Sequence, residues 1–436
     1  MSVREYRPEE LDPTGELDPF LPTDAERRTV HGRHLLGVDG VQTLPQAVRD
    51  RMAAVARVMP FKVNGYIVDH LIDWEDPQHD PIFQLTFPQP DMLTGEEQQV
   101  LSDAPAGEDE QAGERMLRLL SVDPGGQMAH NVPTWQGKSL TGVQHKYANT
   151  VLIFPSTGQT CHAYCAYCFR WPQFKPQLGI KHSIRDVAPA VAYVKAHPEV
   201  TDLLFTGGDA MIMTTDRLRG WVEPFLAECP NVRHIRFGTK SLSYWPYRFT
   251  DGERGDSLIE FLRGIVDGGR SVNVMAHLSH PKEMSTPVFA EAVRRVRATG
   301  ATIRSQAPLT RHINDDPRVW ATMWQRQVDL GIVPYYMFVA RPTGNHAYYS
   351  VPLARCLEIY REAVQGVSGL GRTVRGPVMS CDAGKVLIEG TLDRHGQRYF
   401  VMRFLQARDA GELGDIRLYR YDDQALWIDD LEPAAL

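Results

Sequence analysis

The chain has 436 residues, of which 43% are hydrophobic and 23% charged, and this is the composition of an ordinary globular protein. Its 47 basic and 54 acidic residues give a net charge of −7, which argues against a polybasic protein that binds nucleic acid or a membrane surface. The start of the chain lacks the apolar core of a secretory signal, and no stretch approaches the roughly 18 apolar residues of a membrane span. We therefore expect a cytoplasmic protein with no nucleic-acid or membrane partner.

The first part of the chain differs in pattern from the rest. It begins with a proline-rich stretch, continues with helical spacing over residues 45–58, and includes an acidic segment at 94–114 that predicts a solvated loop or a short helix. We expect residues 1–147 to be an N-terminal extension that packs on the main domain.

Residues 148–366 alternate apolar, β-branched runs with segments of helical spacing. The predicted strands are 151–154, 202–205, 234–237, 271–276, 302–306 and 333–340, and the predicted helices between them include 187–196, 218–227, 258–266, 288–298 and 319–330. Consecutive strands joined by right-handed helical crossovers keep adding to one parallel sheet. The pattern predicts an α/β fold, a partial (β/α)6 barrel whose chemistry lies at the carboxyl ends of the strands.

Strand-like alternation returns near residues 373–375, 385–388 and 399–402. We expect residues 367–436 to form a small C-terminal α+β unit.

Three of the six cysteines lie close together, in the segment Cys161-His-Ala-Tyr-Cys165-Ala-Tyr-Cys168, just after the first predicted strand of the barrel. Three thiolates on one loop can hold three irons of a [4Fe-4S] cluster and leave the fourth iron open to a small molecule. The alternative is a zinc site. Structural zinc usually has four ligands in paired elements, whereas Cys229, Cys356 and Cys381 are scattered singly.

The spacing CxxxCxxC, with the aromatic Tyr167 before the last cysteine, resembles the signature of the radical S-adenosylmethionine (SAM) superfamily. The second predicted barrel strand ends in Phe205-Thr-Gly-Gly-Asp-Ala210. Gly207 and Gly208 allow the backbone to approach a ligand, and Asp209 offers a carboxylate to an ammonium group. By resemblance this is the motif that holds the amino group of SAM.

From Gln144 to about Gly390 the chain resembles the lysine 2,3-aminomutase family of that superfamily. The resemblance lies in His145-Lys-Tyr147, the cysteine triplet with Phe169-Arg170, Thr206-Gly-Gly-Asp-Ala210, Ala276-His-Leu-Ser-His-Pro281, Arg311-His-Ile-Asn-Asp315, Pro334-Tyr-Tyr-Met-Phe338 and Gly384-Lys385. It implies a [4Fe-4S] cluster, a 5′-deoxyadenosyl radical made from SAM, and pyridoxal 5′-phosphate (PLP), which together move an amino group from the α- to the β-carbon of an amino acid.

The resemblance also implies roles for single residues. Arg170 matches the arginine that binds the substrate carboxylate, for which a planar guanidinium is suited. Lys385 matches the lysine that forms the PLP Schiff base, which requires an amine in a partly desolvated pocket. His277 and Gln306 match positions that face SAM, and Lys146 and Tyr147 fall among the cofactor-binding positions.

The chain departs from the family pattern at several positions. Arg341 replaces a carboxylate that helps to bind the distal ammonium of lysine, so we expect an acidic or uncharged substrate side chain instead; Asp382 could supply a carboxylate to the same pocket. Lys146 and Thr150 stand where the family has phosphate-binding arginines, and Phe338 replaces a tyrosine that faces the phosphate. No cysteine follows Cys381, so the family's C-terminal zinc cluster is missing.

The first hypothesis is therefore a PLP-dependent 2,3-aminomutase that acts on a free amino acid as a small-molecule substrate and takes electrons from a donor such as flavodoxin or ferredoxin. Its oligomeric state is left open, with a homo-oligomer as one option. The alternatives are a PLP-independent radical SAM epimerase, dehydrogenase or other hydrogen-abstracting enzyme on an amino-acid-like substrate, and a non-catalytic iron–sulfur or zinc interaction protein.

Overall fold

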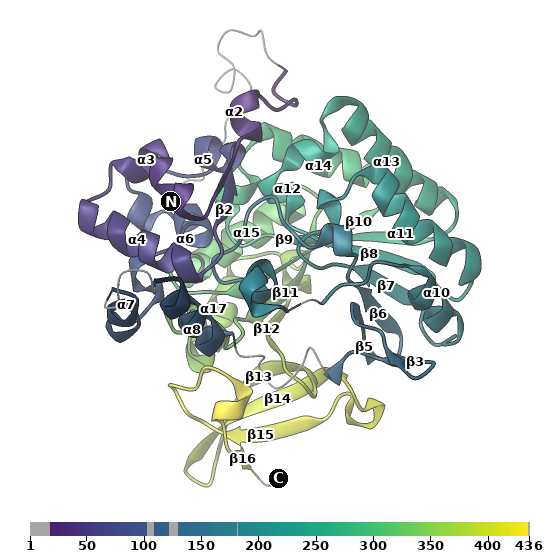
Figure 1. Cartoon of the computed structure of the whole chain (residues 1–436). Coiled ribbons are helices and arrows are strands. Elements are labelled where there is room, and N and C mark those ends of the chain that lie inside the picture. Colours follow the sequence, from purple (N-terminus) through teal and green to yellow (C-terminus); the bar gives the residue numbers. More distant parts are fainter. Residues whose placement is uncertain (1–17, 103–108, 122–129, 181, 435–436) are drawn as a thin grey trace.

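The computed structural model describes residues 18–102, 109–121, 130–180 and 182–434. It has a mixed α/β architecture in which one large sheet lies between N-terminal helices and the helices that connect its strands (Figure 1). Most of the proline-rich start, and residues 103–108 of the acidic segment, lie outside the described residues.

The large sheet contains 12 strands among the described residues, in the order in which they occur along the chain. They are β5 (Val143–Tyr147), β6 (Thr150–Ile153), β7 (Asp202–Phe205), β8 (His234–Thr239), β9 (Ser271–His277), β10 (Thr302–Leu309), β11 (Val333–Val339), β12 (Arg375–Ser380), β13 (Gly384–Arg394), β14 (Gln397–Ala407), β15 (Ile416–Arg420) and β16 (Pro433–Ala434). Neighbours from β6 to β12 pair in parallel, while β5 and the strands from β13 onward pair antiparallel.

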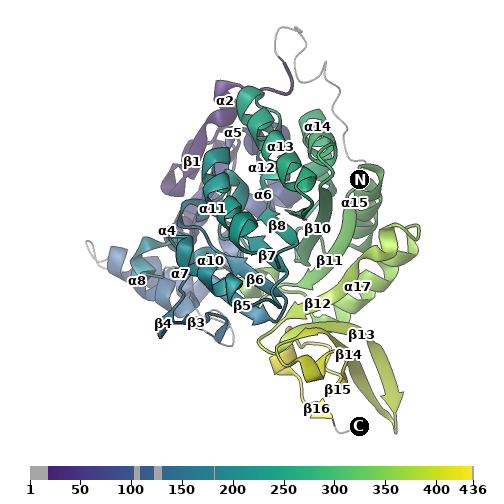
Figure 2. The same cartoon turned by 90° about the vertical axis from the view of Figure 1, so that its right-hand side faces the viewer.

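Long helices connect the parallel strands and lie along one face of the sheet (Figure 2). They are α10 (Ala188–Lys195), α11 (Thr215–Glu228), α13 (Gly252–Asp267), α14 (Pro287–Arg297), α15 (Pro317–Asp329) and α17 (Leu353–Gln365). The six predicted strands and the five predicted helices between them are confirmed, with shifts of a few residues at their ends.

The sequence predicted one parallel strand too few. The strand-like segment near residue 373 was assigned to a separate C-terminal unit, but the strand β12 begins at Arg375 and pairs in parallel with β11. The reason is α17, an amphipathic helix with six buried residues that returns the chain to the same edge of the sheet. The antiparallel strands β13 to β16 then extend that sheet.

Strand β10 shows how the sheet separates an apolar face from a polar one. Ile303, Ala307 and Leu309 are buried, whereas Arg304 and Gln306, which alternate with them, are partly exposed. Successive strand residues point to opposite faces, so the first set packs in the hydrophobic core, while Gln306 of the second set lines an internal cavity.

Helix α14 shows why the connecting segments are helical. The Thr286 side chain accepts a hydrogen bond from the Phe289 backbone N–H, and Pro287 occupies the first turn, where a missing N–H is harmless. Its buried residues recur at helical spacing, and its last turn carries three arginines, which interact favourably with the helix dipole.

The N-terminal part forms a second hydrophobic core beside the sheet. Its elements are α2 (Asp24–Arg27), β1 (Thr29–His31), α3 (Asp39–Gln42), α4 (Gln46–Val58), β2 (Lys62–Asn64), α5 (Gly65–His70), α6 (Pro81–Thr86), α7 (Gly95–Ser102) and α8 (Asp109–Leu120), followed by the hairpin β3 (Thr134–Trp135) and β4 (Lys138–Ser139). The helix predicted at 45–58 is confirmed as α4. The acidic segment, predicted as a solvated loop or a short helix, is helical from Gly95 onward in its described residues and forms α7 and the start of α8.

The second core extends into loops at the carboxyl ends of the parallel strands. It includes Ala163 and Trp171 from the cysteine segment, and Tyr244 and Tyr247 after β8. The N-terminal layer therefore covers the end of the sheet at which the sequence placed the chemistry. No described helix is long and apolar enough to cross a membrane.

Asn64 joins the N-terminal layer to the short helix that follows β8. Its side-chain oxygen accepts from the Ile67 N–H at 3.0 Å, and its amide donates to the Tyr244 carbonyl at 2.8 Å, both in buried surroundings. We predict that Asn64→Ala lowers the free energy of unfolding by about 2–3 kcal/mol, because it removes a helix cap and leaves two buried polar groups unpaired. Urea unfolding followed by circular dichroism measures this, with the exposed Asn149→Ala as a control that we expect to cost less than about 0.5 kcal/mol.

Candidate functional site

One internal cavity of about 380 Å³ receives side chains from the sheet and from the cysteine segment. Its lining comes from strands β5 to β14, together with the loops that follow β6, β7, β8 and β11. Of the residues predicted to form a site, this cavity brings together Cys161, Cys165, Cys168, Lys146, Tyr147, Tyr167, Arg170, Gly207, Gly208, Asp209, His277, Gln306, Arg341 and Lys385.

The cysteine segment is held by backbone hydrogen bonds to the N-terminal layer. The Tyr164 N–H donates to the Lys62 carbonyl at 2.9 Å, and the Ala166 N–H donates to the Leu85 carbonyl at 2.8 Å. The layer therefore fixes the path of the segment on both sides of Cys165, which is why it is ordered although it has little regular secondary structure.

The three sulfurs line the cavity without meeting at one point. Among the residues that the structure describes, no three Cys, His, Asp or Glu side chains form a group that could bind a single metal ion. Cys229, Cys356 and Cys381 are buried elsewhere and add no ligand. Burial raises the pKa of the Cys165 thiol to about 12, so its thiolate requires a positively charged partner.

Gly207 and Gly208 pack against the chain segment 158–160, which immediately precedes Cys161. Gly207 has φ +144°, and a Cβ atom at Gly208 would lie 2.5 Å from the Thr160 carbonyl oxygen. The Asp209 N–H donates to that same oxygen at 2.8 Å. Both glycines line the cavity, but the close backbone approach that requires them is to residues 158–160 of the chain itself.

Asp209 differs from the expectation that its carboxylate receives an ammonium group. Its two oxygens accept four hydrogen bonds from within the protein: from the Met211 N–H, the Thr239 hydroxyl, the Lys240 N–H and the Ser241 hydroxyl, at 2.6–3.1 Å. The carboxylate is 2% exposed. It ties the loop after β7 to the loop after β8, and the spacing of Gly-Gly-Asp alone could not reveal these donors.

Tyr167 and His277 bind each other across the cavity wall. The Tyr167 hydroxyl lies 2.8 Å from both His277 Nε2 and Ser279 Oγ. Burial, with Lys240 nearby, lowers the pKa of His277 well below its usual range, so the ring is neutral. Gln306, on β10, also lines the cavity.

Arg170 is the buried cation beside Cys168. Its guanidinium carbon lies 4.5 Å from the centre of the Phe154 ring and 5.0 Å from that of Phe169. Nη1 is buried and has no hydrogen-bond partner among the described residues. Burial lowers the Arg170 pKa to about 10, and the group is still a cation at neutral pH. An unpaired buried donor of this kind is suited to a carboxylate ligand.

Arg341 lies on the same aromatic ring. Its guanidinium carbon is 4.4 Å from the centre of Phe169, and its Nη2 donates to the Ser380 hydroxyl at 3.1 Å. The only acidic side chain in the lining is Asp209, which is already saturated. The cavity is therefore electropositive and suits anionic ligands.

Lys385 enters the cavity from β13. Its Nζ donates to Gln406 Oε1 at 2.7 Å and lies 4.8 Å from the centre of the Tyr336 ring. Burial, followed by the positive charges of Arg236 and Lys146, lowers its pKa to about 7. A large fraction of this amine is therefore neutral and nucleophilic at physiological pH.

Lys146 and Tyr147 flank Lys385. Lys146 donates to the Cys381 carbonyl, and burial lowers its pKa to about 8. The buried Tyr147 hydroxyl has no hydrogen-bond partner in the described part of the chain. Thr150 and Phe338, which replace two family positions, also line the cavity.

Asp382 does not reach the cavity, contrary to the expectation that it could supply a carboxylate there. It accepts from Arg408 Nη2 at 2.8 Å and lies 3.3 Å from His130 Nδ1, at a partly exposed position. The turn between β12 and β13 directs Asp382 away from Lys385. Arg408, which directly follows β14, forms an ion pair with Asp382.

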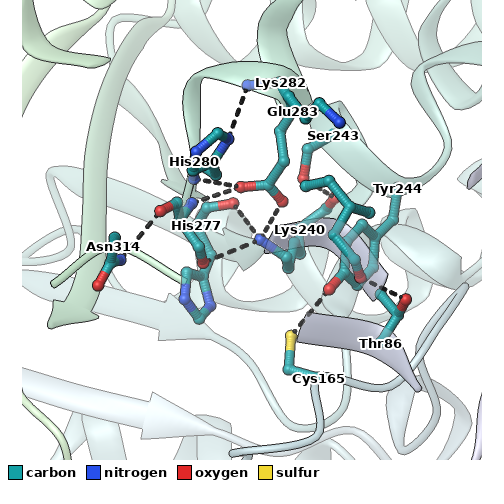
Figure 3. A network of polar contacts seen from close by, with 12 residues as sticks. Thr86, Cys165, Lys240, Ser243, Tyr244, His277, His280, Lys282, Glu283 and Asn314 are labelled. Carbon is teal, nitrogen blue, oxygen red and sulfur yellow. Dashed lines mark hydrogen bonds and ion pairs between the residues drawn. The ribbon is translucent and has the colours of Figure 1, made fainter. Parts of the chain in front are cut away.

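Three residues near the cysteines were missed from the sequence. Lys240 and Glu283 form a buried ion pair, and Tyr244 contacts Cys165, so that a polar network extends from the loop after β9 to the cysteine segment (Figure 3). Lys240 directly follows Thr239, and nothing in its local pattern indicated burial.

The chain is similar to proteins named as aminomutases. It is 29% identical to a protein of Aquifex aeolicus named "Putative L-lysine 2,3-aminomutase", over 91% of this chain and 94% of the other. It is 29% identical to the L-lysine 2,3-aminomutase of Escherichia coli, over 54% and 64% of the two chains. It is 28% identical to the glutamate 2,3-aminomutase of Clostridioides difficile, over 50% and 48%. No family model matches the chain.

Solved structures give weaker similarities. The radical SAM methyltransferase TsrM from Kitasatospora setae overlaps with a TM-score of 0.30 at 15% identity, over 44% of this chain and 36% of the other. SuiB of Streptococcus suis, bound to its precursor peptide, overlaps with a TM-score of 0.34 at 12% identity, over 59% and 51%.

The sequence similarity includes a relative aligned over nearly the whole of both chains. The cysteine triplet, Arg170 and Lys385, which carried the resemblance in the sequence, all line one cavity. The chain is therefore similar, over nearly its whole length, to a protein named as a putative L-lysine 2,3-aminomutase, and over about half its length to named lysine and glutamate 2,3-aminomutases.

Proposed function

We propose that the protein is a radical SAM amino acid 2,3-aminomutase that uses a [4Fe-4S] cluster, SAM and PLP. The observation that carries the proposal is that three cysteine sulfurs and one partly buried amine with a pKa of about 7 line the same cavity. The relatives named as lysine and glutamate 2,3-aminomutases support the reaction class.

The sulfur positions favour a cluster over zinc. Zn–S bonds of about 2.3 Å would bring all sulfurs to within about 4 Å of one another around a single ion. In a [4Fe-4S] cluster each thiolate binds a different iron, so the sulfurs lie further apart. Three cysteines that face one cavity but form no single-ion site fit the second arrangement.

The absent groups would supply the radical chemistry: the reduced cluster gives SAM the electron that cleaves it, and PLP provides a π-system through which an amino group can migrate. The chain's own residues would bind and orient. Cys161, Cys165 and Cys168 would hold the cluster, and Lys385 would bond covalently to PLP. Arg170 would hold the substrate carboxylate.

We infer that the parallel strands curve as a partial barrel around the cavity. Strands far apart in the sheet order, from β5 to β14, all contribute to the lining of one 380 Å³ space. The N-terminal layer covers the cavity at the carboxyl ends of the strands, through the second hydrophobic core. Such a wall would exclude water and keep a radical from side reactions.

We infer further that the substrate is an amino acid with an acidic or uncharged side chain. The guanidinium carbons of Arg170 and Arg341 lie 5.0 Å and 4.4 Å from the centre of the same Phe169 ring, and the lining offers no free carboxylate among its residues. A lysine side chain would meet like charge in a buried site, whereas a second carboxylate could pair with Arg341.

A PLP-independent reaction on the same framework is the second candidate. It is favoured by two residues at positions where the family binds the PLP phosphate. Lys146 donates to the Cys381 carbonyl, and Phe338 has no hydroxyl. The buried Tyr147 hydroxyl and the Lys385 amine favour the first candidate.

The first prediction concerns the cluster. Anaerobically reconstituted protein should contain about four irons per chain and release 5′-deoxyadenosine from SAM when reduced. We expect Cys165→Ala to lose the iron and the cleavage activity, and Cys229→Ala, a buried cysteine outside the cavity, to keep both. Stoichiometric zinc with tetrahedral sulfur coordination would contradict the proposal.

The second prediction concerns Lys385. Borohydride should fix PLP on this residue, detected by peptide mass spectrometry, and Lys385→Ala should lose the adduct and turnover while it retains the iron. Because only the neutral amine reacts and burial lowers the pKa to about 7, attachment should accelerate from pH 6 to 8 and then level off. An ordinary lysine, with a pKa near 10.4, would still accelerate above pH 9. Full activity of Lys385→Ala would favour the PLP-independent candidate.

The third prediction concerns substrate charge. In a competition assay with lysine, glutamate and a neutral amino acid, we expect lysine to turn over at least about tenfold more slowly than the best substrate. Arg341→Asp should shift preference toward lysine, whereas the exposed Arg33→Asp, which changes the net charge equally, should not. Efficient lysine turnover by the unaltered enzyme would refute the charge argument.

A further inference from the structure

A tyrosine hydroxyl contacts one of the three cysteines. Tyr244, at the end of the short helix α12 (Ser241–Tyr244), places its oxygen 3.3 Å from Cys165 Sγ (Figure 3). The tyrosine is 1% exposed, so water does not compete for this contact. Tyr167 and Tyr164, which flank Cys165 in the sequence, place their hydroxyls on other partners: His277 and Ser279 for Tyr167, and Thr160 for Tyr164.

The direction of this hydrogen bond follows from the chemistry of the sulfur. A cysteine that binds iron does so as a thiolate and carries no proton. In the loaded protein the Tyr244 hydroxyl must therefore be the donor and the sulfur the acceptor. A hydrogen bond to a charged sulfur is among the stronger kinds.

The surroundings fix Tyr244 from three sides. Its backbone N–H donates to the Lys240 carbonyl at 2.9 Å, and its carbonyl accepts from Asn64 at 2.8 Å. The Lys240 ammonium lies 4.6 Å from the centre of the Tyr244 ring. Aromatic rings attract such a cation, so Lys240 helps to hold the ring in place.

The charge of Lys240 is itself balanced. It pairs with the fully buried Glu283, whose carboxylate also accepts from the His280 N–H at 3.0 Å, and its Nζ lies 3.2 Å from the His277 carbonyl. Lys240 lowers the pKa of the Cys165 thiol and Glu283 raises it, so the glutamate offsets part of the lysine's charge at the sulfur. Of these three groups, the Tyr244 hydroxyl is the one that contacts the sulfur directly.

We propose that Tyr244 is a positioning residue that raises the reduction potential of the cluster by donating a hydrogen bond to the Cys165 thiolate. Reduction adds one electron, and part of its charge falls on the sulfur ligands. A donor at the sulfur therefore stabilises the reduced form more than the oxidised form. This inference rests on the proposed function, since it requires the cluster.

The test is an EPR-monitored redox titration of the reconstituted full-length protein without SAM. Tyr244→Phe removes only the hydroxyl, and we expect the ratio of reduced to oxidised cluster at a fixed potential to fall about tenfold, a shift of about −59 mV for a one-electron couple. Tyr247→Phe is the matched control: it removes a buried hydroxyl three residues away that donates to Glu26, and we expect no shift.

A second variant covers the case in which Tyr244→Phe loses iron. Site-specific 3-fluorotyrosine at position 244 keeps the ring and makes the hydroxyl a stronger donor, so the potential should move in the positive direction. A negative shift for Tyr244→Phe together with a positive shift for 3-fluorotyrosine supports the inference. Where the Phe variant loses iron, the positive shift of the 3-fluorotyrosine protein alone supports it. A potential unchanged from the wild type in the 3-fluorotyrosine protein, or in a Tyr244→Phe protein with full iron content, overturns it.

These outcomes are distinguishable from failure of the proposed function. If the unaltered protein assembles no [4Fe-4S] cluster, the proposed function fails before any titration is made. If it assembles the cluster and cleaves SAM while neither variant shifts the potential, the proposed function stands and only the role of Tyr244 is wrong.

Discussion

The site depends on the backbone contact between residues 158–160 and the Gly207-Gly208 turn. A Cβ atom on Gly208 would lie about 2.5 Å from backbone atoms of Thr160, and Gly207 has φ +144°, a conformation that favours glycine, so both positions require glycine. The contact starts the cysteine segment at the carboxyl end of β6 and β7, and the N-terminal layer then holds the rest of that segment through Lys62 and Leu85. Neither the sheet nor the N-terminal core alone would place the three sulfurs over the cavity.

Burial of positive charge is the second constraint. Lys385, Lys146 and Arg170 all lie in the wall of one cavity, and burial lowers the pKa of each. Keeping several cations in such a space costs free energy unless an anion joins them. The unbalanced positive charge of the cavity therefore favours anionic ligands. Carboxylates and a phosphate are the groups that would restore it, and this preference agrees with Arg341 where the family pattern has an acid.

The sequence predicted the local elements well and the long-range contacts less well. The parallel strands and their helices carry strong apolar periodicity, and the cysteine triplet has a specific spacing, so both were visible in the chain. The seventh parallel strand, β12, was missed because its pattern resembles that of the antiparallel strands after it. The saturation of Asp209 and the outward position of Asp382 depend on donors 26 to 32 residues away, and the Lys240–Glu283 pair joins two loops. Such partners leave no local trace in the sequence.

The central claim is that the cavity joins a radical-forming cluster to an amino acid held for abstraction of its hydrogen. The most direct measurement is transfer of deuterium: reduced, reconstituted protein is incubated with SAM and with glutamate deuterated at the β-carbon, and 5′-deoxyadenosine is analysed by mass spectrometry. We predict deuterium in the 5′-deoxyadenosine and formation of the β-amino isomer. The same measurement is made with deuterated neutral and basic amino acids. If 5′-deoxyadenosine is released but carries no deuterium with every one of these amino acids, the account is contradicted.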